Sequence, residues 1–124
     1  MSEVKKTPMN GSCIISEEVI ATIACTAALE VPGVASMAQR PVDIRGLMAS
    51  QALKSVAVLN TAYETVLDVY INLEVDTRIP DVAAEVQHSV KVAVQSMTGK
   101  PVTKVNVHVM GVSFDKASEE TANG

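Results

Sequence analysis

The chain has 124 residues, of which 48% are hydrophobic and 19% charged, a balance typical of a globular domain rather than a disordered segment. Ten Lys and Arg stand against fourteen Asp and Glu, and this acidic balance, without a run of basic residues, argues against nucleic-acid binding. With two Tyr, one Phe and no Trp, the core must be aliphatic, and aromatic platforms for bases or sugars are almost absent.

Both ends of the chain mix charged and polar residues without a hydrophobic period. We therefore expect flexible tails at residues 1–10 and 115–124 around a single domain of residues 11–114. No apolar segment follows Lys5 and Lys6, and no apolar run is long enough to cross a membrane. The sequence thus predicts a cytoplasmic protein that would reach a membrane only through a partner.

The first third of the chain predicts a short strand and a helix. Residues 13–15 form a β-like stretch, and Ser16 stands where a helix N-cap is expected. Small apolar residues at helical spacing follow, and Pro32 with Gly33 ends the helix. Residues 34–53 show the weakest pattern, which we interpret as a loop with one or two helical turns.

The middle of the chain predicts a β-hairpin. Residues 56–58 indicate a strand, residues 60–64 a turn, and residues 67–75 a return strand in which apolar and polar side chains alternate strictly. A period of two means that one face of this strand is buried and the other is exposed to solvent.

The last third predicts a second helix and a final strand. Pro80 suits a first helical turn and Gly99 a C-cap. The predicted apolar stripe of this helix is Ile79, Val82, Ala83, Val86, Val90, Ala93 and Met97. Val105, Val107 and Val109 then alternate with polar residues, and the parity changes at Gly111, which suggests a β-bulge.

These elements predict an α+β fold in the order β-α-β-β-α-β. The sheet is expected to be small and mixed, with three or four strands and two main helices on one face. The second helix should form a right-handed crossover to a parallel final strand. We place that strand beside the first strand of the hairpin, with two open sheet edges.

Residue types that support catalysis or metal binding do not form a convergent pattern. The two cysteines, Cys13 and Cys25, are predicted to be reduced thiols without a zinc site. A nucleophilic Cys25 would need an electropositive setting, whereas its helix begins with two Glu. His88 and His108 lack a third metal ligand. The sequence therefore predicts no enzyme, no catalytic residues, no cofactor and no metal site.

An RNA-binding module is a weaker alternative. The order of elements resembles that of KH domains, but their Gly-x-x-Gly clamp with basic flanks is missing.

The outward parity of the predicted sheet suggests an interaction face. Tyr and Met are enriched where proteins dock, and the candidate residues are Tyr70, Asn72, Asn106, His108 and Met110. An ordinary solvated sheet face explains the same pattern, so both interpretations stay open.

Two stretches resemble the signature of the alkaline shock, or envelope stress response, protein family. The first is GSCIISEEVIATIA, continuing to EVPGV at residues 30–34, and the second runs from Val86 through MTG at 97–99 to VNVHV and Gly111. The resemblance covers residues 11–114 and gives structural roles to Gly11, Ser16, Pro32, Gly33, Gly99 and Gly111. The sequence departs from the family pattern at Cys25 and at residues 76–78.

The resemblance implies a cytoplasmic protein of Gram-positive bacteria with no known enzymatic reaction. It implies either self-assembly near the membrane through a small membrane-anchor protein, or a soluble role in the control of fatty-acid synthesis. Our leading hypothesis is a non-catalytic scaffold or regulatory protein of the envelope stress response that acts by self-association and docking. The alternative is a soluble regulator of a fatty-acid-synthesis enzyme.

Overall fold

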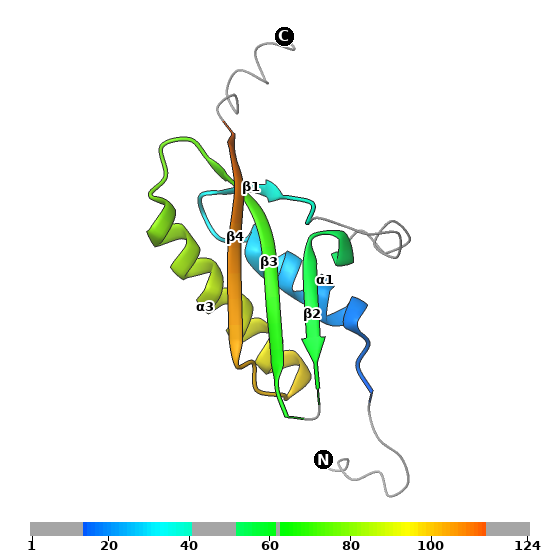
Figure 1. The fold of residues 1–124 in the computed structure, drawn as a ribbon. Helices are drawn as coiled ribbons and strands as arrows, with labels where there is room; N and C mark the ends of the chain where they lie inside the picture. Colours follow the sequence, from blue (N-terminus) through cyan, green and yellow to red (C-terminus); the bar gives the residue numbers. More distant parts are fainter. Residues whose placement is uncertain (1–13, 41–51, 62, 114–124) are drawn as a thin grey trace, which may run out of the picture.

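The computed structural model describes residues 14–40, 52–61 and 63–113. The elements in chain order are α1 (Glu17–Leu29), β1 (Val34–Met37), the short 3-10 helix η1 (Ala52–Lys54), β2 (Val56–Asn60), β3 (Thr65–Glu74), α3 (Ile79–Thr98) and β4 (Lys104–Ser113) (Figure 1). The predictions for both tails, Gly11 and Cys13 lie outside the described residues.

Strand β3 is the centre of a four-stranded mixed sheet. Along one edge, β2 pairs antiparallel with the first half of β3 and β1 with the second half. Along the other edge, β4 runs parallel to β3 over almost its full length. The predicted α+β class and mixed sheet are confirmed.

The position of the last strand differs from the prediction. We expected β4 beside the first hairpin strand, but it pairs with β3. The tight hairpin already places β2 on one edge of β3, so the crossover through α3 delivers β4 to the edge that is still free.

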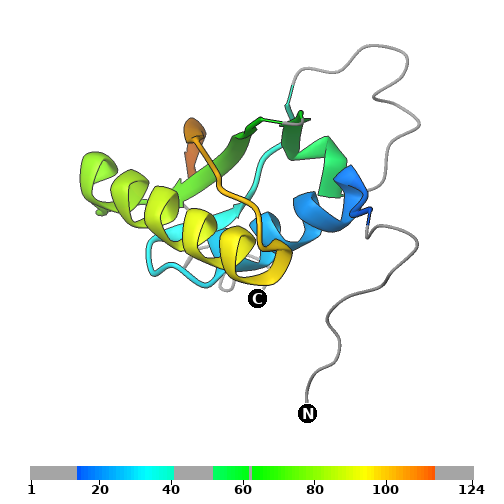
Figure 2. The same cartoon turned by 90° about the horizontal axis from the view of Figure 1, so that it is seen from below.

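Both helices cover the same face of the sheet, as predicted (Figure 2). The core-facing side chains of β3 are Leu67, Val69, Ile71 and Leu73, and all four are 0% exposed. Ala21, Ala24 and Ala28 of α1 are also fully buried, because small side chains let this helix approach the sheet closely.

The predicted strand at residues 13–15 is wrong in its described part. Residues 14–16 have no strand pairing, and Ile14 is 86% exposed. The first strand is instead β1, inside the region interpreted as a loop. Gly33, at φ +103°, turns the chain there, and its carbonyl accepts the Glu74 N–H at 2.8 Å, which places β1 against the end of β3.

The helix termini follow the predicted signals. The Ser16 hydroxyl accepts the Val19 N–H at 3.2 Å, and Gly99 adopts a left-handed conformation as the C-cap of α3. Pro32 is exposed in the turn after α1, between Gly33 and the buried Val31. A side chain at Gly33 would lie 2.8 Å from Val82 Cγ2, so this glycine is also required by close packing.

The apolar stripe of α3 is shorter than predicted. Val82, Val86, Val90 and Val94 are buried, whereas Ile79 is 46% and Met97 70% exposed. The buried residues recur every fourth position. Val94 was not part of the predicted stripe, whereas the predicted Ala83 and Ala93 are only partly buried.

The predicted bulge in β4 is confirmed. Val109 pairs with Ile71 and Gly111 with Asn72, so Met110 is the extra residue. The bulge restores the alternation of core-facing and outward-facing residues in the last part of the strand.

Candidate interaction surface

The face of the sheet opposite α1 and α3 is here called the open face. No described helix packs on it, and Figure 1 views the molecule with the helices behind the sheet. Its central polar residues are Ser36, Asp68, Tyr70, Asn72, Asn106 and His108. Four of the five residues predicted for an interaction face are therefore neighbours on β3 and β4.

Asp68 organises the middle of the open face. Asn106 Nδ2 donates a hydrogen bond to Asp68 Oδ1 at 3.0 Å, and His108 Nε2 lies 3.0 Å from the same oxygen. An ionised carboxylate can only accept, so Nε2 is the donor in this contact. The side chains of His108 and Asp68 are 40% and 33% exposed, which leaves the pair accessible from solvent.

Tyr70 and His108 form a stacked pair beside this carboxylate. The two residues are direct partners across β3 and β4, their ring centroids are 4.3 Å apart, and the ring planes differ by 8°. Because Asp68 fixes the imidazole, the stack presents a flat aromatic surface with little rotational freedom.

A shallow hollow of about 400 Å³ lies farther along the open face, between β1, β3 and β4. Asn72 Nδ2 donates to Ser36 Oγ at 3.1 Å across its floor. A Cβ atom at Gly111 would lie 3.1 Å from Asn72 Oδ1, so the absent side chain leaves room for the Asn72 amide.

The fifth candidate, Met110, is the extra residue of the bulge and is 51% exposed. Sequence reasoning placed Asp68 on the outward parity but gave it no special role, although it contacts two of the candidates. Ser36 was missed, because it belongs to a strand that the sequence pattern did not reveal.

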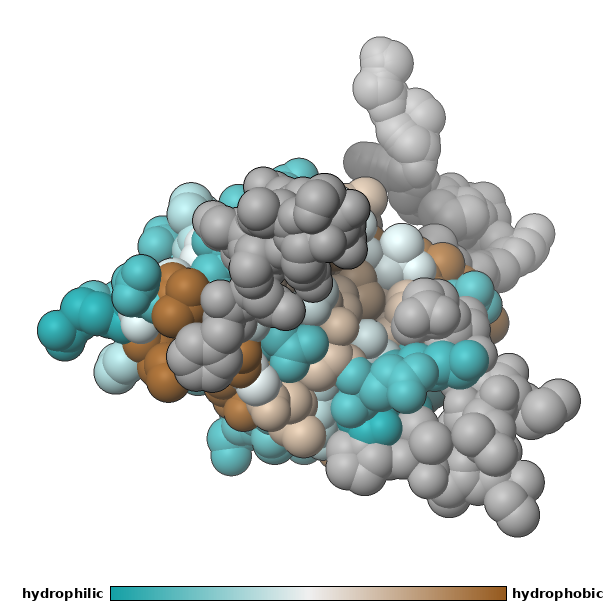
Figure 3. All heavy atoms as spheres, turned by 90° about the horizontal axis from the view of Figure 1, so that it is seen from above, coloured by the Kyte–Doolittle hydropathy of each residue, from teal (hydrophilic) through white to brown (hydrophobic). Residues whose placement is uncertain are grey.

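Hydrophobic side chains are also exposed away from the open face. Figure 3 shows a compact group of them beside hydrophilic residues at the end of the molecule where β1 lies. Exposed hydrophobicity by itself therefore does not distinguish the open face. The open face is distinguished instead by its ordered polar and aromatic contacts.

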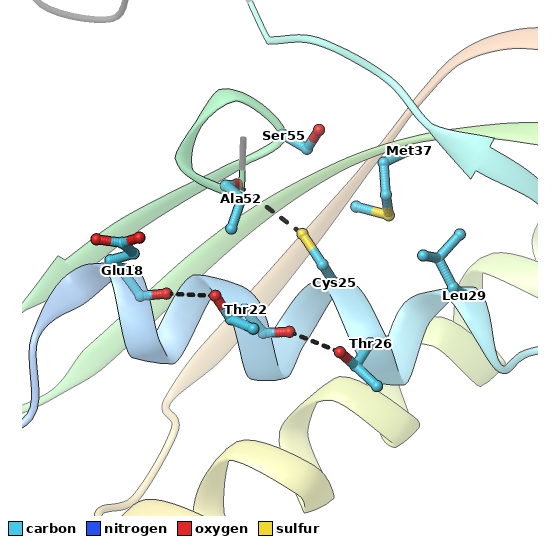
Figure 4. Close-up of a pocket in the computed structure, with 8 residues that line it drawn as sticks. All are labelled: Glu18, Thr22, Cys25, Thr26, Leu29, Met37, Ala52 and Ser55. Atoms are coloured by element: carbon cyan, nitrogen blue, oxygen red, sulfur yellow. Dashed lines mark hydrogen bonds between the residues drawn. The ribbon is translucent and has the colours of Figure 1, made fainter. Parts of the chain in front are cut away.

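A second hollow, of about 470 Å³, lies between α1, β1 and η1 and contains Cys25 (Figure 4). Its lining residues are Glu18, Thr22, Cys25, Thr26, Leu29, Met37, Ala52 and Ser55. The Cys25 thiol points to the Ala52 carbonyl oxygen at 3.9 Å. Burial raises the pKa of this thiol, which disfavours the thiolate that a nucleophile would need.

The described residues include no group of three or more His, Cys, Asp or Glu side chains arranged to hold a metal ion. His88 lies on α3 and His108 on β4, so the two imidazoles belong to different elements. Among the described helices, none combines the length and apolar character that crossing a membrane requires.

Solved structures of the MamM CTD share this fold. One of them is 16% identical to this chain, with a TM-score of 0.50, and the match covers 77% of this chain and 99% of that chain. At such low identity, the similarity concerns the fold alone.

Relatives at higher identity are uncharacterized bacterial proteins. YqhY of Bacillus subtilis is 31% identical over 119 residues, which cover 89% of this chain and 83% of YqhY. YloU of the same organism is 34% identical over 106 residues, covering 82% of this chain and 88% of YloU.

A family model matches residues 5–114, which include all of the described residues, and its description is the alkaline shock protein 23 family, cell envelope-related function. The match includes the capping, turn and bulge positions at Ser16, Gly33, Gly99 and Gly111. The chain therefore belongs to the alkaline shock protein family.

Proposed function

We propose that this chain is a non-catalytic docking protein that binds a protein partner through the open face. The observation that supports this most directly is the Tyr70–His108 stack, held by Asp68 on a sheet face that no described helix covers. Tyr is enriched at protein interfaces, and side chains that are already ordered lose little entropy on binding.

The family description, which is a cell envelope-related function, supports a role of this kind at the cell envelope. We propose a small membrane-anchor protein as the partner, with this chain on the cytoplasmic side of the membrane. The net charge of −4 disfavours direct binding to anionic lipid headgroups, which supports attachment through a protein.

Self-association is the second part of the proposal. Two copies could meet through their open faces, where the ordered Tyr70–His108 stack of each copy would supply aromatic contact area. Copies that meet through this face would compete with the partner for it, so assembly and docking would be alternatives.

The test uses the double variant Tyr70→Ala/His108→Ala in the full chain. We expect loss of the partner in a pull-down from cells and a shift towards monomer by light scattering over a concentration series. Tyr63→Ala is the matched control, because this exposed tyrosine lies in the hairpin turn, away from the stack. Unchanged partner binding and unchanged size in a folded double variant would contradict the proposal.

Cell fractionation tests the proposed location. The wild-type chain should sediment with the membrane fraction, and the double variant should move to the soluble fraction. A wild-type chain found wholly in the soluble fraction would contradict the membrane-anchor partner and would favour a soluble regulator instead.

A further inference from the structure

A groove runs between α3 and the outer edge of β4, and we call it the edge groove. Its lining residues are Ala84, Gln87, His88, Lys91, Thr103, Lys104 and Val105, and its volume is about 380 Å³. In Figure 1, α3 and β4 lie along the same margin of the molecule. The groove is therefore separate from the open face.

The charge of the edge groove is opposite to that of the whole chain. Lys91, Lys104 and His88 line it, and none of its described lining residues is acidic, although the chain carries a net charge of −4. Both lysines are exposed, and neither forms an ion pair with another described residue. Two ammonium groups are thus available to an acidic ligand.

The groove also borders an unpaired strand edge. Among the described strands, β4 pairs only with β3, so alternate residues direct their backbone N–H and C=O groups away from the sheet. Lys104–Val109 is a regular six-residue stretch before the bulge, without proline and with one charged side chain. A stretch of this kind can accept an additional strand.

One hydrogen bond inside the edge groove joins its two walls, α3 and β4. Gln87 Nε2 on α3 donates a hydrogen bond to the Val105 carbonyl oxygen at 3.2 Å. A strand added along β4 would share the Val105 carbonyl oxygen with Gln87 or displace it, and it would lie within reach of side chains of α3.

We infer that the edge groove binds an extended, acidic segment of a partner protein, which adds to the sheet as a further strand beside Lys104–Val109. Side chains of such a segment alternate between the two sides of the sheet. An acidic residue on the helix side would face Lys91 of α3, and an acidic residue on the other side would face Lys104, which has the parity of Asn106 and His108. A nucleic acid could use only the charges, whereas a peptide also satisfies the strand backbone. The inference rests on the proposed function in one respect, that the chain acts by docking, but it uses a different surface.

The test begins with a selection of random dodecapeptides against the full chain. We expect enrichment of Asp or Glu at two positions an odd number of residues apart, because Lys91 and Lys104 lie on opposite sides of the sheet, with β-branched residues between them. The charge-reversed variant Lys91→Glu/Lys104→Glu should instead enrich Lys or Arg. Selected peptides without an acidic preference, or the same peptides selected by both proteins, would overturn the inference.

A synthetic peptide from the selection then tests the mode of binding. It should slow hydrogen exchange of the outward-facing β4 amides, and Lys91→Gln/Lys104→Gln, which keeps the side-chain length, should weaken its binding about tenfold. Binding without protection of β4 amides would overturn strand addition. Tighter binding of an oligouridine to the same lysines would overturn the peptide in favour of nucleic acid.

Controls separate this site from the open face. Tyr70→Ala/His108→Ala should bind the peptide as the wild-type chain does, and Lys91→Gln/Lys104→Gln should keep the interaction assigned to the open face. Failure of peptide binding with intact partner capture would reject only the edge groove, and the converse result would reject only the open face.

Discussion

Successive residues of β3 point to opposite faces of the sheet, and the two faces are stabilised in different ways. Towards the helices, Leu67, Val69, Ile71 and Leu73 are fully buried. Towards the open face, Asp68 and Tyr70 are partly exposed and are held by directed contacts with β4. The first face is held together by the removal of aliphatic surface from water, and the second by geometry between polar groups.

The magnitudes of these effects differ several-fold. Burial of one large aliphatic side chain contributes about 1.5–3 kcal/mol, whereas a cross-strand pair on a sheet surface contributes about 0.2–1 kcal/mol. Folding should therefore depend mainly on the face of the sheet that α1 and α3 cover, here called the covered face. The open face can vary, or specialise for a partner, at small cost to stability.

Ile71→Ala should produce the largest effect. It removes a fully buried side chain and leaves a cavity in the aliphatic core, so we expect a loss of about 3 kcal/mol in the free energy of unfolding. Asn72→Ala, the next residue on the opposite face, should cost less than about 1 kcal/mol. Urea unfolding of both variants measures the contrast, and equal losses would refute the division between the faces.

Asp68→Ala should be the most damaging single change on the open face. It removes the acceptor shared by Asn106 and His108, and we expect a loss of about 1 kcal/mol because both donors can still reach water. Asp68→Asn keeps an acceptor oxygen and should cost less. A loss as large as that of Ile71→Ala would show that the open face supports the fold.

The Tyr70–His108 stack should contribute a smaller coupling. A double-mutant cycle with Tyr70→Ala and His108→Ala should give about 0.5–1 kcal/mol. The paired cycle of Tyr70 with His88, which lies on α3, should give none. Coupling within error of zero for the stacked pair would mean that the rings are not ordered in solution, and would remove the main support for the proposed docking surface.

Cys25 tests the boundary of the covered face. Burial raises its pKa, so its alkylation should rise with pH only above the range of an ordinary thiol. For the same reason, its contribution to stability is present at neutral pH and is lost as pH rises through the raised pKa. Iodoacetamide labelling of a Cys13→Ser variant, folded and in denaturant, measures this. If the folded and the denatured chain were labelled at the same rate at every pH, the Cys25 thiol would be exposed.

Much of this fold follows from local patterns in the sequence. The strict alternation of β3 reflects one buried face. Ser16 and Gly99 mark two helix ends because each satisfies a local backbone requirement, and Gly111 marks the bulge because the alternation of β4 changes parity there. Similarly, the outward parity of residues 67–75 and 105–110 in the sequence predicts that Tyr70 and His108 lie on one surface.

Strand β1 could not be recognised in this way. Its four residues, VASM, have no distinctive pattern, and they become a strand because the turn at Gly33 brings them to the free end of β3. Conversely, the apolar residues Ile14 and Ile15 have high β-propensity but form no described pairing. Short segments depend on available neighbours more than on their own composition.

The sequence by itself determined the helices, the hairpin, the aliphatic core and the sides of β3 and β4 that meet solvent, because these depend on spacing along the chain. Only the tertiary structure decided which strands are neighbours. Pairing of β4 with β3 places Asn106 and His108 against Asp68 and aligns the β4 edge with the lysine of α3. These contacts join residues far apart in sequence, so they depend on the packing of the whole sheet.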